Sequence, residues 1–420
     1  MACGSALWLF WAVPVAHCQL VGAEFQINTH TTADQKDAAA AFDGAGNFIV
    51  VWHSYDQDGS GEGIFARRFD AEALPLGPEF QVNASTADDQ VHPSVAADAL
   101  GNFVVVWDYR PSAGPWAPFG RRFDVSGAPL GGDFEVNSAA SDLQYGVNVA
   151  MGGGGDFVVV WNGYDDDETL SLDIFARRFD AAGAPLGEQF QVSTYEQQLA
   201  AHREASVVLL PGGDFVVVWS GDEEGLSEEI LGQRFDSEGT AQGGNFRISM
   251  DSQGPGNRRP SVARLATGGF VVVWSGWFAS RVFGRRYDAA GMPLGDEFQV
   301  SEATGHDQVA SSVAGDGLGG FAVVWWSTDQ GGPPEGIFGR LFDSDGNAVS
   351  GDFQVNGNAA GGQRYPWMAS DGAGDFIAAW DSDAQDGDGR GVFARRLRLG
   401  VVLVDGFESG DTSAWSAVVP

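Results

Sequence analysis

Two short segments of the chain are dense in aspartate, and each directly follows a strand motif that ends in tryptophan, at Trp52 and at Trp380. The aspartates are Asp56, Asp58, Asp381, Asp383, Asp386 and Asp388. Ca²⁺ takes about six to eight oxygen ligands, often from alternating aspartates with glycine at the bend. Neither segment completes the calcium loop that ends in glutamate. The pattern predicts either a calcium site or, as the more ordinary outcome, a solvated acidic rim without a bound cofactor.

A pair of arginines recurs in a short aromatic motif. The complete pairs are Arg67/Arg68, Arg121/Arg122, Arg177/Arg178, Arg285/Arg286 and Arg395/Arg396. Alternate side chains of an extended strand share a face, so Arg67 lies beside Phe65 and Phe69. We expect its guanidinium to cover an aromatic ring such as Trp52. Repetition of the pair along the chain favours a role in the scaffold over ligand binding.

Glutamine and histidine recur near these motifs. The glutamines are Gln35, Gln90, Gln144, Gln253, Gln308 and Gln363. We expect them to bond the backbone of the connecting loops, and a ring of binders for sugar hydroxyls is the alternative. The histidines of the same connections, which are His30, His92, His202 and His306, stand at non-equivalent offsets. Without an HExxH motif or paired spacing, they argue against a histidine metal site.

No sequence motif identifies a catalytic centre. The chain has no GxSxG, P-loop or dinucleotide fingerprint. Glycosidases use two carboxyl groups at a set separation, and this acidic chain leaves that chemistry open. The repeats stay close to one consensus, which favours a protein that binds without catalysing a reaction.

Seven copies of the string F-x-[VA]-[VA]-W organise the chain. They end at Trp52, Trp107, Trp161, Trp219, Trp274, Trp325 and Trp380. The steps between them are 55, 54, 58, 55, 51 and 55 residues, so the repeat is close to regular. A unit of this length points to a repeat architecture.

Each repeat predicts four strands, which we name a, b, c and d. In the first copy, strand b is residues 48–52, strand c is residues 65–69 and strand d begins at Phe80. Strand b is apolar on both faces, so both must be covered. Radial stacking of the copies covers them, which predicts an all-β, seven-bladed β-propeller of four-stranded antiparallel blades. A linear β-solenoid is the rival architecture.

The two ends of the chain suggest how the ring closes. A d-type strand, residues 25–28, opens the chain, and no FQV copy follows the last strand c at residues 393–397. The N-terminal strand is therefore expected to complete the last blade and to remove an open edge. Residues 401–404 are the competing candidate for that outer strand.

The meander also separates the loops. Short a–b and c–d turns fall on one side, and longer b–c and d–a loops fall on the other. Function concentrates on loops that a rigid scaffold holds. We therefore expect a glycan or protein ligand on the b–c/d–a face, or at that mouth of the central channel.

The net negative charge of the chain and its first 23 residues indicate which partners to exclude and where the protein is located. The chain has 57 acidic and 23 basic side chains, which argues against nucleic acid and against anionic lipid. Residues 1–23 read as a signal peptide, and no stretch is long and apolar enough to span a membrane. Cys3 and Cys18 both lie in that leader, and lipidation at Cys18 is the alternative. The expected domains are the leader, a propeller over residues 24–400 and a tail over residues 401–420, in a monomer.

The strings VVW, FARRFD and PLGxEFQVN resemble a repeat common in large secreted bacterial proteins, over about residues 24–399. The tail from Asp405 resembles a short C-terminal string of exported bacterial proteins. The resemblance implies export or a cell-surface location and brings no catalytic residues. Together with the repeat, it predicts a secreted, non-catalytic module that binds a glycan or a protein, with or without Ca²⁺. A propeller enzyme acting on polysaccharide, as a lyase or glycosidase, is the alternative.

Overall fold

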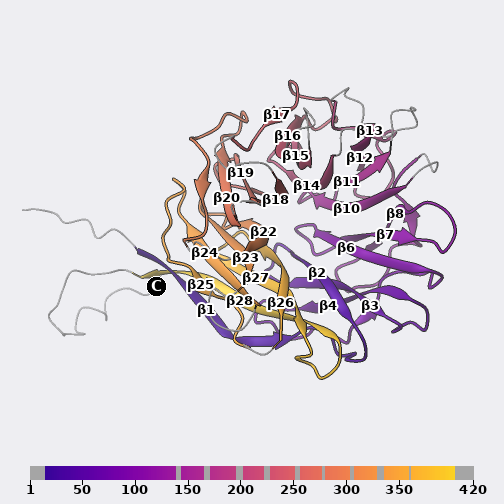
Figure 1. The fold of residues 1–420 in the computed structure, drawn as a ribbon. Helices are drawn as coiled ribbons and strands as arrows, with labels where there is room; N and C mark the ends of the chain where they lie inside the picture. Colours follow the sequence, from indigo (N-terminus) through magenta and orange to yellow (C-terminus); the bar gives the residue numbers. More distant parts are fainter. Residues whose placement is uncertain are drawn as a thin grey trace, which may run out of the picture.

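The computed structural model describes residues 15–138, 143–164, 171–194, 202–221, 228–250, 256–276, 280–302, 307–328, 335–358 and 361–402. These residues form strands β1 to β28 and no helix. The strands make seven four-stranded antiparallel sheets. Figure 1 shows the sheets arranged as blades around a central channel, with the first strand of each blade innermost. The predicted seven-bladed propeller is confirmed, and the solenoid is excluded.

The strand bounds follow the repeat. Blades 1 and 2 contain β2 (Gln35–Phe42), β3 (Phe48–Tyr55), β4 (Glu62–Phe69), β5 (Phe80–Gln81), β6 (Asp89–Ala97), β7 (Phe103–Arg110), β8 (Ala117–Phe123) and β9 (Phe134–Glu135). Blades 3 and 4 contain β10 (Gln144–Met151), β11 (Phe157–Tyr164), β12 (Leu172–Phe179), β13 (Phe190–Gln191), β14 (Arg203–Leu209), β15 (Phe215–Gly221), β16 (Glu229–Phe235) and β17 (Phe246–Arg247). Blades 5 and 6 contain β18 (Asn257–Arg264), β19 (Phe270–Gly276), β20 (Arg281–Tyr287), β21 (Phe298–Gln299), β22 (Gln308–Gly315), β23 (Phe321–Thr328), β24 (Glu335–Phe342) and β25 (Phe353–Gln354). Blade 7 contains β26 (Gln363–Ser370), β27 (Asp375–Asp383), β28 (Arg390–Val402) and β1 (Val15–Gln26).

The core lies between the blades. All seven repeat tryptophans are at most 1% exposed, and in β3 both alternating sets of side chains are buried. Stacked phenylalanines add to this packing within blades 1, 2, 3, 4 and 6, as in the pair Phe48 and Phe69, whose ring centroids lie 5.0 Å apart. Burial of both faces of strand b therefore comes from the neighbouring blades, as its sequence predicts.

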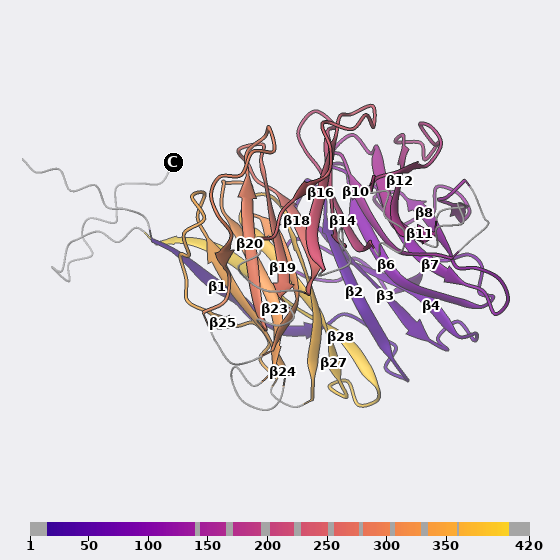
Figure 2. The ribbon, with the colours of Figure 1, turned by 45° about the horizontal axis from the view of Figure 1, so that its top comes forward.

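The N-terminal strand closes the ring. Phe25 pairs with Ala394, and the N–H of Ile27 donates to the Val392 carbonyl at 2.9 Å. Figures 1 and 2 show β1 beside β28, so the two ends of the chain share one blade. The competing outer strand is wrong, because Val401 and Val402 extend β28 and pair with residues 15 and 16 of β1. The predicted leader overlaps β1, and its cleavage stays a prediction.

The arginine pairs of blades 1, 2 and 3 link their blade to both neighbours. The first arginine reaches back, since Arg121 Nη1 donates to the Val82 carbonyl of blade 1 at 2.9 Å. The second reaches forward, since Arg68 Nη1 donates to the Ser126 carbonyl of blade 2 at 2.5 Å. The scaffold role is therefore correct, but the aromatic partner is not Trp52. Arg67 lies over Phe69, 5.4 Å from its centroid, because both residues are on one face of β4 while Trp52 is buried between the blades.

Every strand a has a bulge near its start. The pairing of β2 with β3 shifts between Lys36 and Ala39, and the other six blades shift at the same place. One residue in each bulge is left-handed: Asp37, His92, Gly146, Glu204, Arg259, Ala310 and Tyr365. We call these the bulge residues. A left-handed residue other than glycine costs about 1 kcal/mol and persists only where the surrounding structure fixes it.

Candidate functional site

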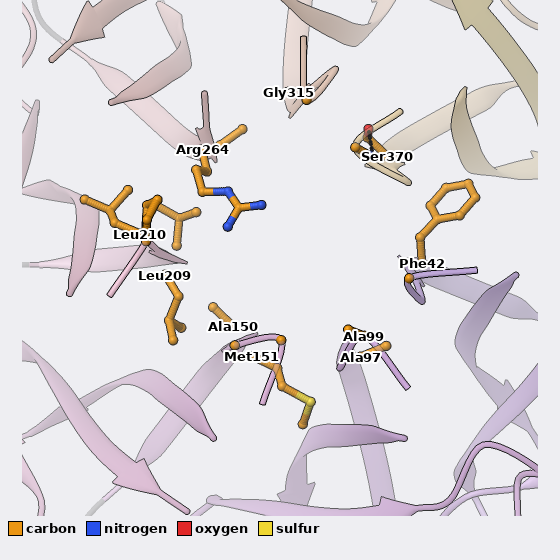
Figure 3. A pocket seen from close by; sticks show the side chains of 18 of the residues that line it. Phe42, Ala97, Ala99, Ala150, Met151, Leu209, Leu210, Arg264, Gly315 and Ser370 are labelled. Atoms are coloured by element: carbon orange, nitrogen blue, oxygen red, sulfur yellow. Dashed lines mark hydrogen bonds between the residues drawn. The ribbon is translucent and has the colours of Figure 1, made fainter. Parts of the chain in front are cut away.

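The channel has two mouths. The turn-side mouth lies at the a–b turns and opens into a cavity of about 980 Å³. The last residues of the strands a form a ring around it: Phe42, Ala97, Met151, Leu209, Arg264, Gly315 and Ser370. Figure 3 shows this ring, with the Arg264 side chain reaching into the opening. The ring is otherwise uncharged, so it offers no pair of acid and base groups.

Aspartates on the rim of this mouth hold the turns together. Asp43 Oδ1 accepts the N–H groups of Ala45 and Asn47 at 2.8 and 2.9 Å. Asp371 Oδ1 accepts those of Ala373 and Asp375 in the same way, at 2.7 and 3.0 Å. These carboxylates bind their own backbone, as aspartates do in tight turns. The carboxylates of Asp43 and Asp371 at the larger cavity are therefore engaged in holding turns and do not form an acid–base pair.

The bulge-side mouth lies at the opposite end, where the b–c and d–a loops leave the blades. Its cavity of about 320 Å³ is lined by six of the seven bulge residues: Asp37, His92, Glu204, Arg259, Ala310 and Tyr365. Because each stands at the same place in its blade, the backbone brings these side chains together. Strained positions of this kind gather at functional sites. This mouth is the candidate functional site.

Asp37 is joined to a buried carboxyl of the last blade. The N–H of Asp37 donates to Oδ2 of Asp381 at 3.2 Å. Asp381 is 1% exposed, and its Oδ1 has no hydrogen-bond partner. Burial, followed by the charge of Asp37, raises the pKa of Asp381 well above its ordinary value. Asp381 thus acts behind the mouth and positions Asp37, which faces the cavity.

His92 completes this side of the mouth. Its Nδ1 lies 3.1 Å from Oδ2 of Asp108, which is fully buried, and its Nε2 lies 3.7 Å from Oδ2 of Asp37. Burial alone would lower the pKa of His92, but the hydrogen bond and charge of Asp108, with the charge of Asp37, raise it above its ordinary value. The imidazole is therefore suited to carry a proton near neutral pH. Asp108 also accepts the N–H of Gly146 at 2.9 Å, so it is fixed in place.

A second histidine lies behind the first. His53 is 2% exposed, and its Nδ1 accepts the N–H of His92 at 3.4 Å. Burial, followed by the charge of His92, lowers the pKa of His53 well below its ordinary value. The two imidazoles therefore differ in role, because His53 supports the backbone while His92 faces the cavity.

The far wall of the mouth carries a second acid. Glu204 Oε2 accepts the N–H of Arg259 at 2.7 Å and the hydroxyl of Ser220 at 3.1 Å. The Arg259 guanidinium lies 3.7 Å from Oε1 of Glu204 and 5.4 Å from the Tyr365 ring centroid. The mouth thus presents carboxyl groups from blade 1 and blade 4, with a protonatable imidazole beside the first.

The predicted calcium ligands lie in two neighbouring blades. Asp56 and Asp58 follow β3, and Asp58 Oδ2 accepts the Gln81 amide at 2.9 Å. Asp381 is buried behind the bulge-side mouth, and Asp383 pairs with Arg390 at 3.1 Å. Asp386 Oδ2 accepts Asn28 Nδ2 at 3.0 Å, and Asp388 Oδ2 accepts the Ala33 N–H at 3.2 Å. Within the described ranges, no three His, Cys, Asp or Glu side chains stand together as a metal site. Calcium binding stays a prediction.

Two of the glutamines, Gln35 and Gln90, bond loop backbone as predicted, whereas Gln363 Nε2 donates to the Ser382 hydroxyl at 2.8 Å. Gln35 Nε2 donates to the Thr32 and Ala33 carbonyls at 2.9 and 3.2 Å. Gln90 Nε2 makes the same pair of bonds to its own loop. Gln253 and His306 lie outside the described residues. Blade 5 carries Asn257 and blade 4 carries His202 at the position equivalent to Gln35, so the assignment of Gln253 to this set is wrong.

Sequence reasoning missed the bulge residues, although a signal for them exists. Each one stands fifteen residues before the tryptophan of its own repeat. Aligning the copies on tryptophan therefore exposes a column that reads Asp, His, Gly, Glu, Arg, Ala, Tyr beside otherwise uniform strands. In that column His92 is equivalent to Asp37 and Glu204, and to none of the other histidines.

In the part of the chain that the structure describes, no helix is long and apolar enough to cross a membrane. No family model matches the chain, and no curated protein matches it. Solved structures with a similar fold include a protein of unknown function from Dyadobacter fermentans, with a TM-score of 0.54 and 11% identity over 91% of this chain and 99% of that one. The α-L-arabinofuranosidase of Fusarium graminearum in complex with arabinobiose matches with a TM-score of 0.51 and 12% identity over 90% and 98% of the two chains. Its complex with an iminosugar inhibitor matches with a TM-score of 0.50 and 11% identity over the same shares. At these identities, the similarity establishes a common propeller fold.

Proposed function

We propose that this protein acts on glycans and hydrolyses a glycosidic bond at the bulge-side mouth. The observation that carries the proposal is the set of bulge residues. The scaffold repeats almost unchanged seven times, yet the bulge position, which lines the mouth, holds Asp37, His92 and Glu204 in blades 1, 2 and 4. Two carboxyl groups that flank a scissile bond are the usual equipment of a glycosidase.

The proposed chemistry divides the mouth into an acid side and a base side. On the base side, Glu204 accepts a proton from water, and the water oxygen bonds to the anomeric carbon. The bond from that carbon to the glycosidic oxygen breaks, and the leaving oxygen takes a proton from the Asp37–His92 pair. His92 suits the acid role because its pKa is raised, and Asp108 orients its ring.

The propeller fold that this chain shares with a solved glycosidase structure gives weaker support for the proposed hydrolysis. The propeller from Fusarium graminearum, whose name gives it as an α-L-arabinofuranosidase, is described bound to arabinobiose. A fold alone does not fix a function, so the argument depends on the side chains at the mouth. The predicted export of the protein agrees with a polysaccharide substrate outside the cell.

A non-catalytic glycan-binding module is the second candidate. The observation that favours it is the position of Asp381, whose pKa is raised well above its ordinary value but whose side chain is buried behind the mouth. A strongly shifted acid that does not line the cavity serves the scaffold rather than the reaction.

The test is release of reducing sugar from a panel of purified arabinans, xylans, galactans and glucans. We expect turnover of at least one polymer, with a loss of about 10²-fold or more in kcat for Asp37→Asn and for Glu204→Gln. Glu72→Gln is the matched control, since Glu72 is an exposed acid on a c–d turn of blade 1. Binding of a polymer without any turnover would support the second candidate instead.

A further inference from the structure

A separate cavity of about 370 Å³ opens between blades 5 and 6 on the same face of the propeller. Glu204 and Arg259 line both this cavity and the bulge-side mouth, so the two spaces share a wall. The other side chains used below are Arg258, Ser275, Asp307 and Trp326, which also line it. Nothing in the proposed acid–base chemistry uses this cavity.

A link between blades that is present elsewhere in the ring is absent at this cavity. In blades 7, 1 and 2, the residue after the tryptophan accepts the N–H of the next blade's bulge residue: Asp381 accepts from Asp37, His53 from His92 and Asp108 from Gly146. Blades 5 and 6 carry Ser275 and Trp326 at this position. Neither side chain makes such a bond, and the space between the blades stays open.

Two polar groups in the cavity wall have no partner. Ser275 is 4% exposed, and its Oγ makes no hydrogen bond. The Nε1–H of Trp326 is buried and also makes none. Buried polar groups are nearly always satisfied, so each unsatisfied group in a wall calls for an explanation. The Nε1–H groups of Trp52, Trp161, Trp219 and Trp274 also lack a partner. Ser275 and Trp326 differ from them because both line a cavity, where a bound molecule with hydroxyl groups would supply one.

The wall also has an aromatic side. Trp326 lies 6.0 Å from the Tyr365 ring, and Tyr365 lines the bulge-side mouth. Aromatic rings combine an apolar face with a polar edge, which suits a ligand that has both C–H and O–H groups. A continuous path of rings therefore leads from the cavity toward the mouth.

Three of the four charged side chains that line the cavity, Glu204, Arg258 and Arg259, are paired with an opposite charge, and the fourth, Asp307, is held by a hydroxyl group. Arg258 is hydrogen-bonded to Glu228, and the Arg259 guanidinium lies 3.7 Å from Glu204. Asp307 accepts the Ser280 hydroxyl at 2.6 Å. A ligand with a net charge would have to displace one of these partners, whereas an uncharged ligand leaves them in place.

We infer that this cavity is a subsite for an uncharged sugar residue of the substrate, next to the bond that is cleaved. The inference rests on the proposed function for its neighbour but not for its own binding chemistry. Ser275 Oγ and Trp326 Nε1 bond the sugar hydroxyls, and the Trp326 ring packs on its C–H face. The substrate is therefore a neutral polysaccharide that crosses the face from blades 5 and 6 toward blade 1.

The test measures binding by calorimetry on the Asp37→Asn protein, in which the proposed function predicts turnover slowed by about 10²-fold or more. The probes are neutral arabino-, xylo-, galacto- and gluco-oligosaccharides of three to six residues and galacturonate oligosaccharides of the same lengths. We expect at least one neutral series to bind. Adding Trp326→Ala should weaken it about tenfold, the scale of a lost aromatic contact. Adding Ser275→Ala should weaken it about threefold to tenfold.

Two further variants keep the result interpretable. Trp326→Phe retains a ring and guards against misfolding of the alanine variant, and we expect an intermediate loss. Ser327→Ala is the matched control, because Ser327 is a buried hydroxyl on the same strand that bonds the Thr328 carbonyl at 3.4 Å. We expect it to bind like the parent.

The outcomes separate this inference from the proposed function. Hydrolysis with an unchanged KM in the folded Trp326→Ala protein overturns the subsite and leaves the hydrolase standing. Neutral-sugar binding that Trp326→Ala removes, in a protein without turnover, supports the subsite and removes the hydrolase. Tighter binding of the galacturonate series, or no binding of any neutral series, overturns the subsite.

Discussion

The N–H of Asp37 donates to Oδ2 of Asp381 at 3.2 Å, and this bond joins the first blade to the last across 344 residues of sequence. One partner faces the bulge-side mouth, and the other is buried behind it. The same hydrogen bond therefore helps to join the last blade to the first and fixes the position of Asp37 at the candidate site.

Asp381→Asn should change how stability depends on pH. Because burial and the charge of Asp37 raise the pKa of Asp381 in the folded state, the folded protein holds a proton that the unfolded chain releases. Stability therefore falls as pH rises from the unfolded pKa toward the folded one. Asparagine removes this fall, so the difference in Tm, variant minus parent, should be more positive at about pH 8 than at about pH 5. Glu72→Gln should show no such trend, and a difference that shrinks with pH contradicts the assignment.

Asp108→Asn should lower the pKa of His92. The hydrogen bond and charge of Asp108 are what raise it above its ordinary value against the effect of burial. The raised value stabilises the fold below the unfolded pKa of histidine, and this contribution is lost as pH rises through the folded pKa. Imidazole NMR titration measures the change directly, with His30 as the internal control. If His92 is the acid, the alkaline limb of the activity profile moves to lower pH in the same variant.

Arg121→Gln should destabilise the propeller by about 1.5–3 kcal/mol, the value of a hydrogen bond that involves a charged group. Blade 4 shows what glutamine does at this position. Gln233 Nε2 donates to the Gly243 carbonyl at 3.2 Å, within its own blade, and does not reach back as Arg121 reaches the Val82 carbonyl.

The reverse change, Gln233→Arg, should stabilise blade 4 by a similar amount by reaching the Val192 carbonyl of blade 3. Thermal unfolding measures both variants. Equal Tm values for the parent and both variants would show that the link between blades contributes nothing.

Removal of the closing strand should unfold the last blade. Ile27 is fully buried, and the Phe25 ring packs against Phe69 at 5.8 Å. A chain that begins at Glu24 keeps these contacts and should fold, whereas a chain that begins at Thr29 should lose cooperative unfolding. Ile27→Ala, a smaller change at the same place, should cost about 2–4 kcal/mol. A truncated chain from Thr29 with the Tm of the longer one would show that β1 is dispensable.

The sequence was sufficient for the architecture because the fold repeats. Seven copies of one strand motif that is apolar on both faces can be packed in few ways. The last repeat lacks its fourth strand, so the additional strand at residues 25–28 could complete that blade. The outer-strand alternative at residues 401–404 failed because β28 is longer than the repeat predicts. Nothing in an apolar Val-rich run distinguishes the extension of one strand from the start of another.

The sequence predicts a ligand at this mouth of the channel, but it does not identify the residues that line the candidate site. The bulge that turns Asp37 and His92 toward the mouth depends on the backbone geometry of β2 and β6, and its only sequence signal is the column that appears when the repeats are aligned on tryptophan. A run of aspartates predicts a cation site because a sequence does not show which carboxylates already have partners in the fold. In the structure, Asp58 accepts a hydrogen bond from Gln81, and Asp383 pairs with Arg390. These carboxylates are therefore already engaged by protein groups and are less available to a cation than the sequence suggests.

Within each repeat, the bulge residue differs from the positions that build the scaffold. Packing and turns reside in positions that change little between blades, while the proposed function places recognition at a position that differs in every blade. On that proposal, exchanging the six bulge side chains that line the mouth would change the chemistry of the ring and leave its core in place. Such a propeller is a scaffold on which specificity can drift quickly, and the Trp-aligned column is where divergence among its descendants should appear.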